Sequence, residues 1–188
     1  MYANAGKRVF DVLASASGLL VLSPVLLLIA LGVRLSSPGP AIFRQLRVGR
    51  DGKVFEFYKF RTMPMNTGNV PSDQLGEVKI GRLGKALRRT NLDELPQLVN
   101  VLRGDMSVVG PRPPLPSQAE LIELRRENGA LACRPGLTGL AQVSSYDGMP
   151  VEEKAAYDGR YAQAVTLASD VKILLKTVGY FRRPPPKY

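Results

Sequence analysis

The sequence predicts a mostly helical α+β fold: an N-terminal membrane helix-break-helix, then a small β-hairpin with amphipathic helices at the membrane interface. Three observations predict this arrangement. The chain has an uncharged apolar segment near its start, an Asp-Gly pair between two β-rich runs, and several later stretches with apolar residues at helical spacing. With 188 residues, 45% of them hydrophobic, it is long enough for one domain with its own core.

The charge balance narrows the classes of function. The chain has 26 Lys and Arg against 16 Asp and Glu, a formal net charge of +10, which predicts an anionic partner: nucleic acid, anionic lipid or a phosphorylated substrate. It has no histidine, so His-based proton relays and His-ligated metals are excluded. A single cysteine, Cys133, excludes an internal disulfide and is typical of a reducing compartment.

Residues 12–33 form the apolar segment and contain no charged side chain. A straight helix of this length would measure about 33 Å, close to the roughly 30 Å of a bilayer core, so a single spanning helix is one reading. However, Pro24 at the centre removes a backbone donor and frees the Leu20 carbonyl, which the Ser23 hydroxyl is placed to satisfy. The Ser23-Pro24 pair is therefore the predicted break in the membrane helix.

Basic residues flank the apolar segment on both sides, from Lys7 and Arg8 before it to Arg34 after it. Because positive flanks resist translocation, both ends prefer the cytoplasmic side, and this favours a re-entrant hairpin over a span. We therefore predict a membrane hairpin over residues 1–36 and a membrane-associated domain over 37–188, with an unstructured tail at 181–188.

The elements after the hairpin follow in order. Two β-rich runs flank Arg50-Asp51-Gly52, which predicts a β-hairpin. Residues 64–77 predict a loop, 79–89 a basic amphipathic helix, and 134–148 an irregular Gly-rich run. Helices are expected over 120–128, 152–163 and 169–181, the last with one apolar side that suits a membrane interface.

Asp93 and Glu94 stand side by side in RRTNLDELPQLVN, residues 88–100. We expect Thr90 to be the N-cap of a helix whose apolar stripe is Leu95, Leu98, Val99 and Leu102. The start of that helix, together with Arg88 and Arg89, should keep Asp93 ionised at pH 7. An ionised carboxylate in this position suits a helix cap, a metal ligand or a nucleophile, and all three readings stay open on the residues alone.

Cations in other motif-like contexts favour the chemical readings. They lie at the end of a predicted strand or in stretches stiffened by Pro or Gly: Lys59, Arg61, Arg88, Arg112 and Arg134. If they converge on Asp93 and Glu94, the cluster would bind a diphosphate with a divalent cation, as phosphoryl transfer requires. A carboxylate nucleophile needs no deprotonation, which suits a chain without histidine. The chain has neither a GxxxxGK[ST] loop nor a GxGxxG turn.

Several long motifs resemble the bacterial sugar transferases, specifically the small monotopic phosphoglycosyl transferases of the PglC type. The motifs are KRVFD (7–11), SP (23–24), SPGPAIFRQLRVGRDGKVFEFYKFRTM (37–63), LDELPQLVNVLRGDMSVVGPRP (92–113) and RPGLTGLAQV (134–143). The chain departs from the family at Ser144-Ser145-Tyr146-Asp147, where many members have Gly-Arg, and this affects expected contacts to nucleotide or sugar there.

The resemblance implies an enzyme of the bacterial inner membrane with its catalytic domain on the cytoplasmic face. It would move a phosphosugar from a UDP-sugar to undecaprenyl phosphate and release UMP, an early membrane step of polysaccharide synthesis. Asp93 would form a covalent phosphosugar intermediate, and Glu94 would join it in binding Mg²⁺. Arg88 and Arg112 would hold phosphate, with Lys59 and Arg61 in support, and Ser23-Pro24 would break a re-entrant helix. Anionic phospholipid is an expected partner and nucleic acid is not, while a homodimer is left open.

Two other classes of function fit part of the sequence. A membrane-tethered basic protein that binds lipid or nucleic acid without catalysis would explain the charge and the apolar segment, but not the acidic pair. An Mg²⁺-dependent phosphohydrolase would use the same pair with water. Acceptor-dependent release of UMP separates both from a transferase.

Overall fold

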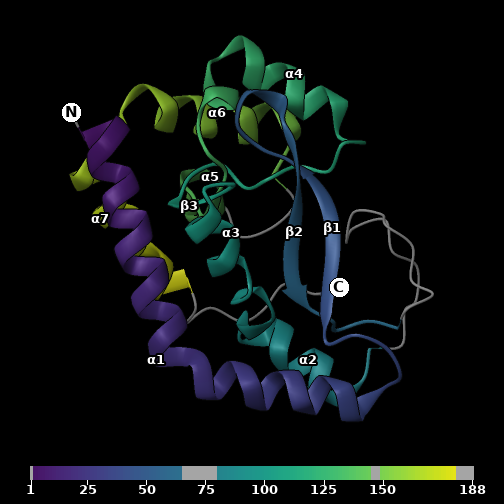
Figure 1. The fold of residues 1–188 in the computed structure, drawn as a ribbon. Helices are drawn as coiled ribbons and strands as arrows, with labels where there is room; N and C mark the ends of the chain where they lie inside the picture. The colour runs from purple at the N-terminus through teal and green to yellow at the C-terminus, as the bar shows by residue number, and fades with distance from the viewer. Residues whose placement is uncertain (1, 65–79, 145–148, 181–188) are drawn as a thin grey trace.

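A computed structural model describes residues 2–64, 80–144 and 149–180, and it confirms a mostly helical α+β fold with a long apolar N-terminal helix (Figure 1). The strands of the described residues form two small sheets. The elements in order are α1 (Lys7–Ser36), β1 (Ile42–Val48), β2 (Val54–Phe60), α2 (Arg82–Arg89), α3 (Gln97–Arg103), β3 (Ser107–Val109), α4 (Ala119–Glu127), β4 (Gly136–Thr138), α5 (Leu140–Ser144), α6 (Val151–Gln163) and α7 (Leu167–Tyr180). The predicted loop beyond residue 64, the tail at 181–188 and the departure at 145–147 lie outside the described residues.

Helix α1 bends in its middle, and Figure 1 shows its second half turning away from the first to run beneath the rest of the fold. Pro24 lies inside the helix, and the Ser23 hydroxyl donates to the Leu20 carbonyl at 2.8 Å. This is the carbonyl that loses its amide partner to the proline, so the predicted contact of the Ser23 hydroxyl is confirmed. The predicted break is not seen as two separate helices, because α1 continues through Ser23 and Pro24 as one bent helix. By length and composition α1 could cross a membrane: its most apolar window has a mean hydropathy of 2.4, with 6% of that window buried.

The first turns of α1 are attached to the rest of the chain by polar contacts. Lys7 Nζ lies 2.6 Å from the Asp170 carboxylate, and Arg8 donates to the last carbonyls of α3, Val101 at 2.6 Å and Leu102 at 2.8 Å. Asp11 is buried and accepts from the Ser107 hydroxyl at the start of β3. The beginning of α1 is thus held by three other elements.

The second half of α1 is attached differently, through apolar packing. Val33, Phe60 and Leu87 form a buried cluster that joins α1 to the end of β2 and to α2. A second cluster of Phe57, Val101 and Met106 joins β2 to α3. The first cluster thus packs α2 against β2 and the second packs α3 against β2, and the chain between α2 and α3 carries the acidic pair.

The predicted hairpin is confirmed. Strands β1 and β2 pair antiparallel in the register Ile42 with Phe60 and Val48 with Val54. The turn residues Asp51 and Gly52 both have positive φ, 56° and 79°, which is the conformation that an Asp-Gly pair favours between two strands.

The prediction of an irregular run over residues 134–148 is wrong for its described part, which contains strand β4, paired parallel with β3, and helix α5. Ser107 pairs with Gly136, and Val109 pairs with Thr138. The strands approach so closely that a Cβ at Gly110 would lie 2.3 Å from the Arg134 carbonyl oxygen, and one at Gly136 would lie 2.1 Å from the Gly110 nitrogen. Only glycine fits at such contacts.

The apolar stripe predicted for α3 is wrong. The buried side chains of this helix are Gln97, Asn100 and Val101, whereas Leu102 is exposed. Asn100 explains why this side of α3, and not the predicted apolar side, is buried. Its amide accepts from the Tyr58 nitrogen at 3.1 Å and donates to the Glu56 carbonyl at 2.7 Å. A buried amide that bonds the free edge of β2 thus decides which side of α3 faces inward.

Candidate active site

Asp93 and Glu94 lie in a single turn of 3-10 helix, Leu92–Glu94, that connects α2 to α3. The prediction that Thr90 is an N-cap is wrong: Thr90 ends α2, and its hydroxyl donates back to the Ala86 carbonyl at 2.9 Å. Asn91 then takes a left-handed conformation with φ 54°, which turns the chain. Helix α3 begins only at Gln97, after Pro96, because proline supplies no amide and suits a helix start.

Asp93 is buried, with 6% of its surface exposed, and burial raises the pKa of its carboxyl to about 6. The neighbouring charge of Glu94 contributes to this raised value, while the charges of Lys59, Arg88 and Arg112 oppose it. The sequence predicts that a helix start and nearby cations lower the pKa of Asp93. In the structure desolvation outweighs the cations, so the pKa is raised instead. With a pKa of about 6 the carboxylate is still ionised in about nine molecules of ten at pH 7.

The Asp93 carboxylate has no hydrogen-bond donor among residues 2–64, 80–144 and 149–180. Its cations act on it through space. Glu94 has the opposite surroundings: both of its carboxylate oxygens accept from the Arg112 guanidinium, at 2.5 and 3.2 Å. Burial tends to raise the pKa of Glu94, but the charge and hydrogen bonds of Arg112 outweigh it, and the pKa is lowered. Within the acidic pair, one carboxylate is fixed by an arginine and the other accepts no hydrogen bond from the described residues.

Lys59 and Arg112 reach the pair from different elements, and Arg47 joins them from β1. Burial lowers the pKa of Lys59, although the charges of Asp93 and Glu94 act against this shift. Burial also lowers the pKa of Arg47, to about 10, with the charge of Arg112 acting in the same direction. Sequence analysis missed Arg47; its only signal was its place in the strand that pairs with the strand of Lys59.

The five predicted phosphate-binding cations do not all meet at Asp93. Three of them, Lys59, Arg88 and Arg112, lower the pKa of Asp93 by their charge. Arg61 is buried and donates instead to the carbonyl of Ser37 at 2.7 Å, just beyond the end of α1. Arg134 donates to the Gly104 carbonyl at 3.0 Å, next to the C-terminus of α3. Arg61 also donates to the Ser37 hydroxyl at 2.9 Å. For Arg61 and Arg134 a role in phosphate binding stays a prediction.

This arrangement suits attack on a phosphorylated group. A buried, ionised carboxylate with no hydrogen-bond donor among the described residues can attack phosphorus without a base, and surrounding cations can offset the charge of phosphate oxygens. The described residues contain no group of three or more metal-ligating side chains. Adjacent carboxylates still fit Mg²⁺, which commonly takes one or two protein carboxylates and completes its shell with substrate oxygens and water.

Comparison with known proteins assigns the chain to a family. Residues 2–183 match the bacterial sugar transferase family. The chain is 44% identical over 181 residues to a UDP-glucose:undecaprenyl-phosphate glucose-1-phosphate transferase of Caulobacter vibrioides, covering 92% of this chain and 68% of that protein. It is 41% identical to the protein of the same name in Escherichia coli, of which it spans 39%. It is also 42% identical to the exopolysaccharide production protein PSS of Rhizobium leguminosarum, with 92% of each chain covered. This chain belongs to the bacterial sugar transferase family.

Proposed function

We propose that the chain transfers a sugar phosphate from a UDP-sugar to undecaprenyl phosphate, releasing UMP, with Asp93 as the covalent nucleophile. Family membership and the names of relatives at about 40% identity support the reaction class. One observation carries the role of Asp93: its carboxylate is buried beside three cations yet has no hydrogen-bond donor among the described residues.

In the first step, an Asp93 oxygen attacks the β-phosphorus of the UDP-sugar. A bond forms between this oxygen and the phosphorus, and the bond from the phosphorus to the bridging oxygen breaks. The electron pair leaves with UMP, so no proton has to move. Lys59, Arg88 and Arg112 offset the charge on the phosphate oxygens. Stabilisation of that charge by groups already in place is the main source of rate enhancement in phosphoryl transfer.

In the second step, a phosphate oxygen of undecaprenyl phosphate attacks the same phosphorus. The bond to Asp93 breaks, its carboxylate is regenerated, and the product is a sugar joined to undecaprenyl through a diphosphate. Because a phosphate acceptor is already ionised near neutral pH, this step also needs no base. A chain without histidine can therefore complete both steps.

Glu94 and Arg112 have supporting roles in this proposal. Their two-point contact fixes both side chains, with Arg112 turned toward the acidic pair, where it can bind a substrate phosphate. Asp93 and Glu94 together would hold Mg²⁺, which when bound would further neutralise the diphosphate.

The test is incubation of the purified chain with a panel of UDP-sugars, Mg²⁺ and undecaprenyl phosphate, with UMP as the readout. We expect UMP in stoichiometric amount without the lipid and continuous turnover with it. Intact-mass analysis of the lipid-free sample should show one added phosphosugar. Peptide mapping of the same sample should place it on the peptide that contains Asp93. Turnover independent of the lipid would indicate a phosphohydrolase, and no UMP with any sugar would leave only a binding protein.

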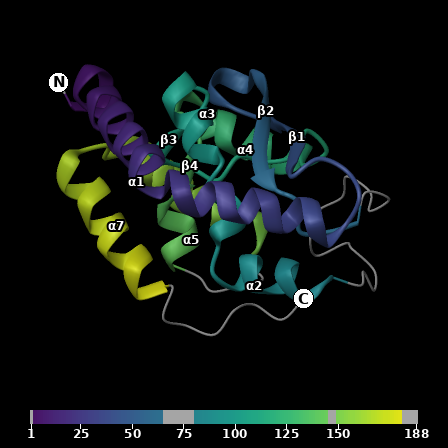
Figure 2. The same ribbon diagram turned by 60° about the horizontal axis from the view of Figure 1, so that its bottom comes forward.

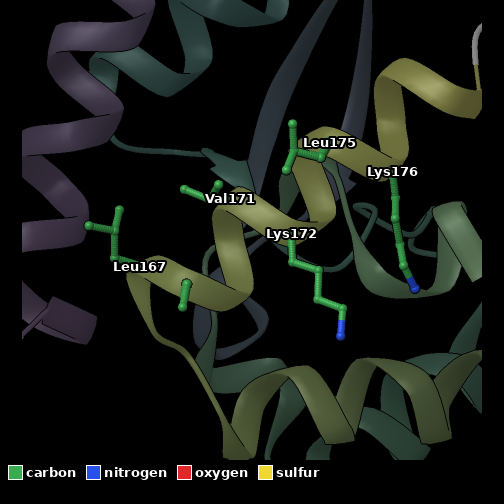
Figure 3. A pocket seen from close by; sticks show the side chains of 6 residues that line it. Leu167, Val171, Lys172, Leu175 and Lys176 are labelled. Atoms are coloured by element: carbon green, nitrogen blue, oxygen red, sulfur yellow. The ribbon is translucent and has the colours of Figure 1, made fainter.

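We further propose that residues 1–36 form a re-entrant membrane hairpin and that 37–188 form a catalytic domain on the cytoplasmic face. The bend at Pro24 and the exposed apolar side chains on both sides of it support this placement, Leu20 and Leu28 among them. Helix α7 offers a second apolar surface, with Leu175 exposed. Figure 3 shows Lys172 and Lys176 extending together from α7 beside an open hollow, as expected of a helix at an anionic membrane surface.

Cysteine labelling tests this topology. Ala3 and Lys53 are exposed and lie on either side of the proposed hairpin. In a Cys133→Ala background, a membrane-impermeant thiol reagent should label Ala3→Cys and Lys53→Cys from the same, cytoplasmic side. Labelling from opposite sides would indicate instead that α1 spans the membrane.

A further inference from the structure

The loop that carries Arg112 has an unusual hydrogen-bonding problem. Residues 111–114 read Pro-Arg-Pro-Pro, so three of the four have no backbone amide. Such a loop can be fixed by its backbone almost only through carbonyl oxygens, and each carbonyl needs a donor from elsewhere in the fold.

All four carbonyls of this loop have a donor. Pro111 accepts from the Gly136 nitrogen at 2.9 Å, and Pro114 accepts from the Val48 nitrogen at 2.9 Å. The two middle carbonyls accept from arginine side chains: Pro113 from Arg47 at 3.1 Å, and Arg112 from Arg125 at 2.9 Å. Two guanidinium groups thus hold the centre of the loop.

Arg125 is itself fixed by a buried ion pair. Its Nε and Nη2 donate to the same Asp158 oxygen, at 2.9 and 2.5 Å, and its Nη1 remains for the Arg112 carbonyl. The side chains are 3% and 1% exposed, and they join α4 to α6. Figure 1 places these two helices together at the end of the fold opposite the second half of α1.

Helix packing alone does not explain a buried ion pair. Desolvation offsets most of the attraction between buried charges, and apolar pairs of similar size often hold two elements equally well. An apolar pair, however, offers no donor to the Arg112 carbonyl. The ion pair therefore supplies something that packing cannot: a donor of fixed direction at the loop that carries a cation of the site.

We propose that Arg125, oriented by Asp158, is a positioning residue that sets Arg112 against Glu94 and toward the substrate diphosphate. The inference rests on the transfer reaction proposed above and adds a residue pair on α4 and α6 to it. Arg125 acts only through the backbone of Arg112. Its loss should let the loop shift, and small displacements of a binding group can lower activity by about 100-fold.

The test replaces the ion pair by an apolar pair, Arg125→Met with Asp158→Leu, in the full-length chain. The matched control is Arg126→Met, because Arg126 is the next residue on α4 and forms an exposed ion pair with Glu123. We expect the double variant to fold, with kcat/KM for lipid-dependent UMP release reduced about 10- to 100-fold. The control should keep wild-type values.

The split between KM and kcat separates positioning from structure. Arg112 would bind the substrate diphosphate, so a displaced Arg112 should raise KM for the UDP-sugar, whereas a loss of folded protein lowers the apparent kcat alone. A folded double variant with unchanged kcat/KM and an unchanged KM would overturn the inference.

A second variant, Arg125→Lys, keeps the inference testable if the double variant does not fold. Arg125→Lys keeps a cation for Asp158, but its single ammonium nitrogen cannot reproduce the three separate donor positions of the guanidinium, so it should fold and show the same rise in KM to a smaller degree. A wild-type KM in this variant would likewise overturn the inference. If the wild-type chain releases no UMP with any sugar, the transfer reaction itself fails, which the same assay shows before any variant is compared.

Discussion

Asp93 and Asp170 are both buried carboxylates with cations nearby, but their surroundings differ in kind. Asp170 is fully buried and accepts from three side chains: the Tyr2 hydroxyl at 2.7 Å, Lys7 Nζ at 2.6 Å and the Tyr161 hydroxyl at 2.8 Å. Its oxygens are occupied by groups from η1 (Tyr2–Gly6), α1 and α6, so it holds these elements to α7.

Asp93 has cations at a distance and no hydrogen-bond donor among the described residues. Its raised pKa means that the folded chain disfavours the charged form of Asp93. A substrate phosphorus or a metal ion would instead stabilise that charge. We propose this difference as a way to separate a structural carboxylate from a reactive one: burial is common to both, and the presence of direct donors distinguishes them.

The largest expected effect is that of Asp93→Asn on activity. We expect lipid-dependent UMP release to fall by about 10³-fold or more, because the nucleophile is lost. The free energy of unfolding at pH 7.5 should rise, by on the order of 2 kcal/mol, since the change removes a charge that the fold disfavours. Asp51→Asn, in the exposed hairpin turn, serves as control. A mutant that keeps most of its activity would remove Asp93 from the mechanism.

Asp170→Asn should have the reverse pattern. Removing one charge of a buried pair leaves Lys7 without its counter-ion, and we expect the free energy of unfolding to fall by about 3 kcal/mol. Thermal unfolding in nanodiscs measures this. Activity per folded molecule should stay near that of the wild type, and a drop comparable to that of Asp93→Asn would end the distinction between the two carboxylates.

The pH dependence sharpens the comparison next. The folded pKa of Asp93, about 6, lies above its ordinary value of 3.8. Its contribution to stability is therefore present at low pH and is lost as the pH rises through about 6. The activity has the opposite trend: below pH 6, kcat/KM should fall about tenfold per pH unit as the nucleophile becomes protonated. A flat profile between pH 5 and 7 would contradict the assignment.

The smallest expected effect is that of Tyr2→Phe, which removes one of the three donors to Asp170. We expect the free energy of unfolding to fall by about 1 kcal/mol, the usual net value of a hydrogen bond and somewhat more for a charged acceptor. No change in melting temperature would mean that this donor does not contribute to the attachment of α1.

Local signals in the sequence predicted the local parts of the fold. The Asp51-Gly52 turn, the helices α4, α6 and α7, and the Ser23 hydroxyl at the Pro24 bend all follow from neighbouring residues. The acidic pair and two of its distal cations, Lys59 and Arg112, were likewise visible as residue types in motif-like places.

Features that depend on distant contacts could not be predicted. The β3–β4 pairing joins three-residue strands that are far apart in the sequence, too short for a period of two to be seen. The inward side of α3 is set by an amide that bonds β2, and Arg125 meets Arg112 only after α4 packs on α6. The pKa of Asp93 depends on desolvation, which no residue pattern near it indicates.

The close approach of β3 and β4 has a consequence for genetics. Gly110 precedes the Arg112 loop, and the Gly136 nitrogen holds the first carbonyl of that loop. A single added methyl group at either glycine would meet backbone atoms, which cannot rotate away as a side chain can. These two codons are therefore where a screen for temperature-sensitive alleles should look first, since a loosened strand pair would release the Arg112 loop while the acidic pair itself stayed intact.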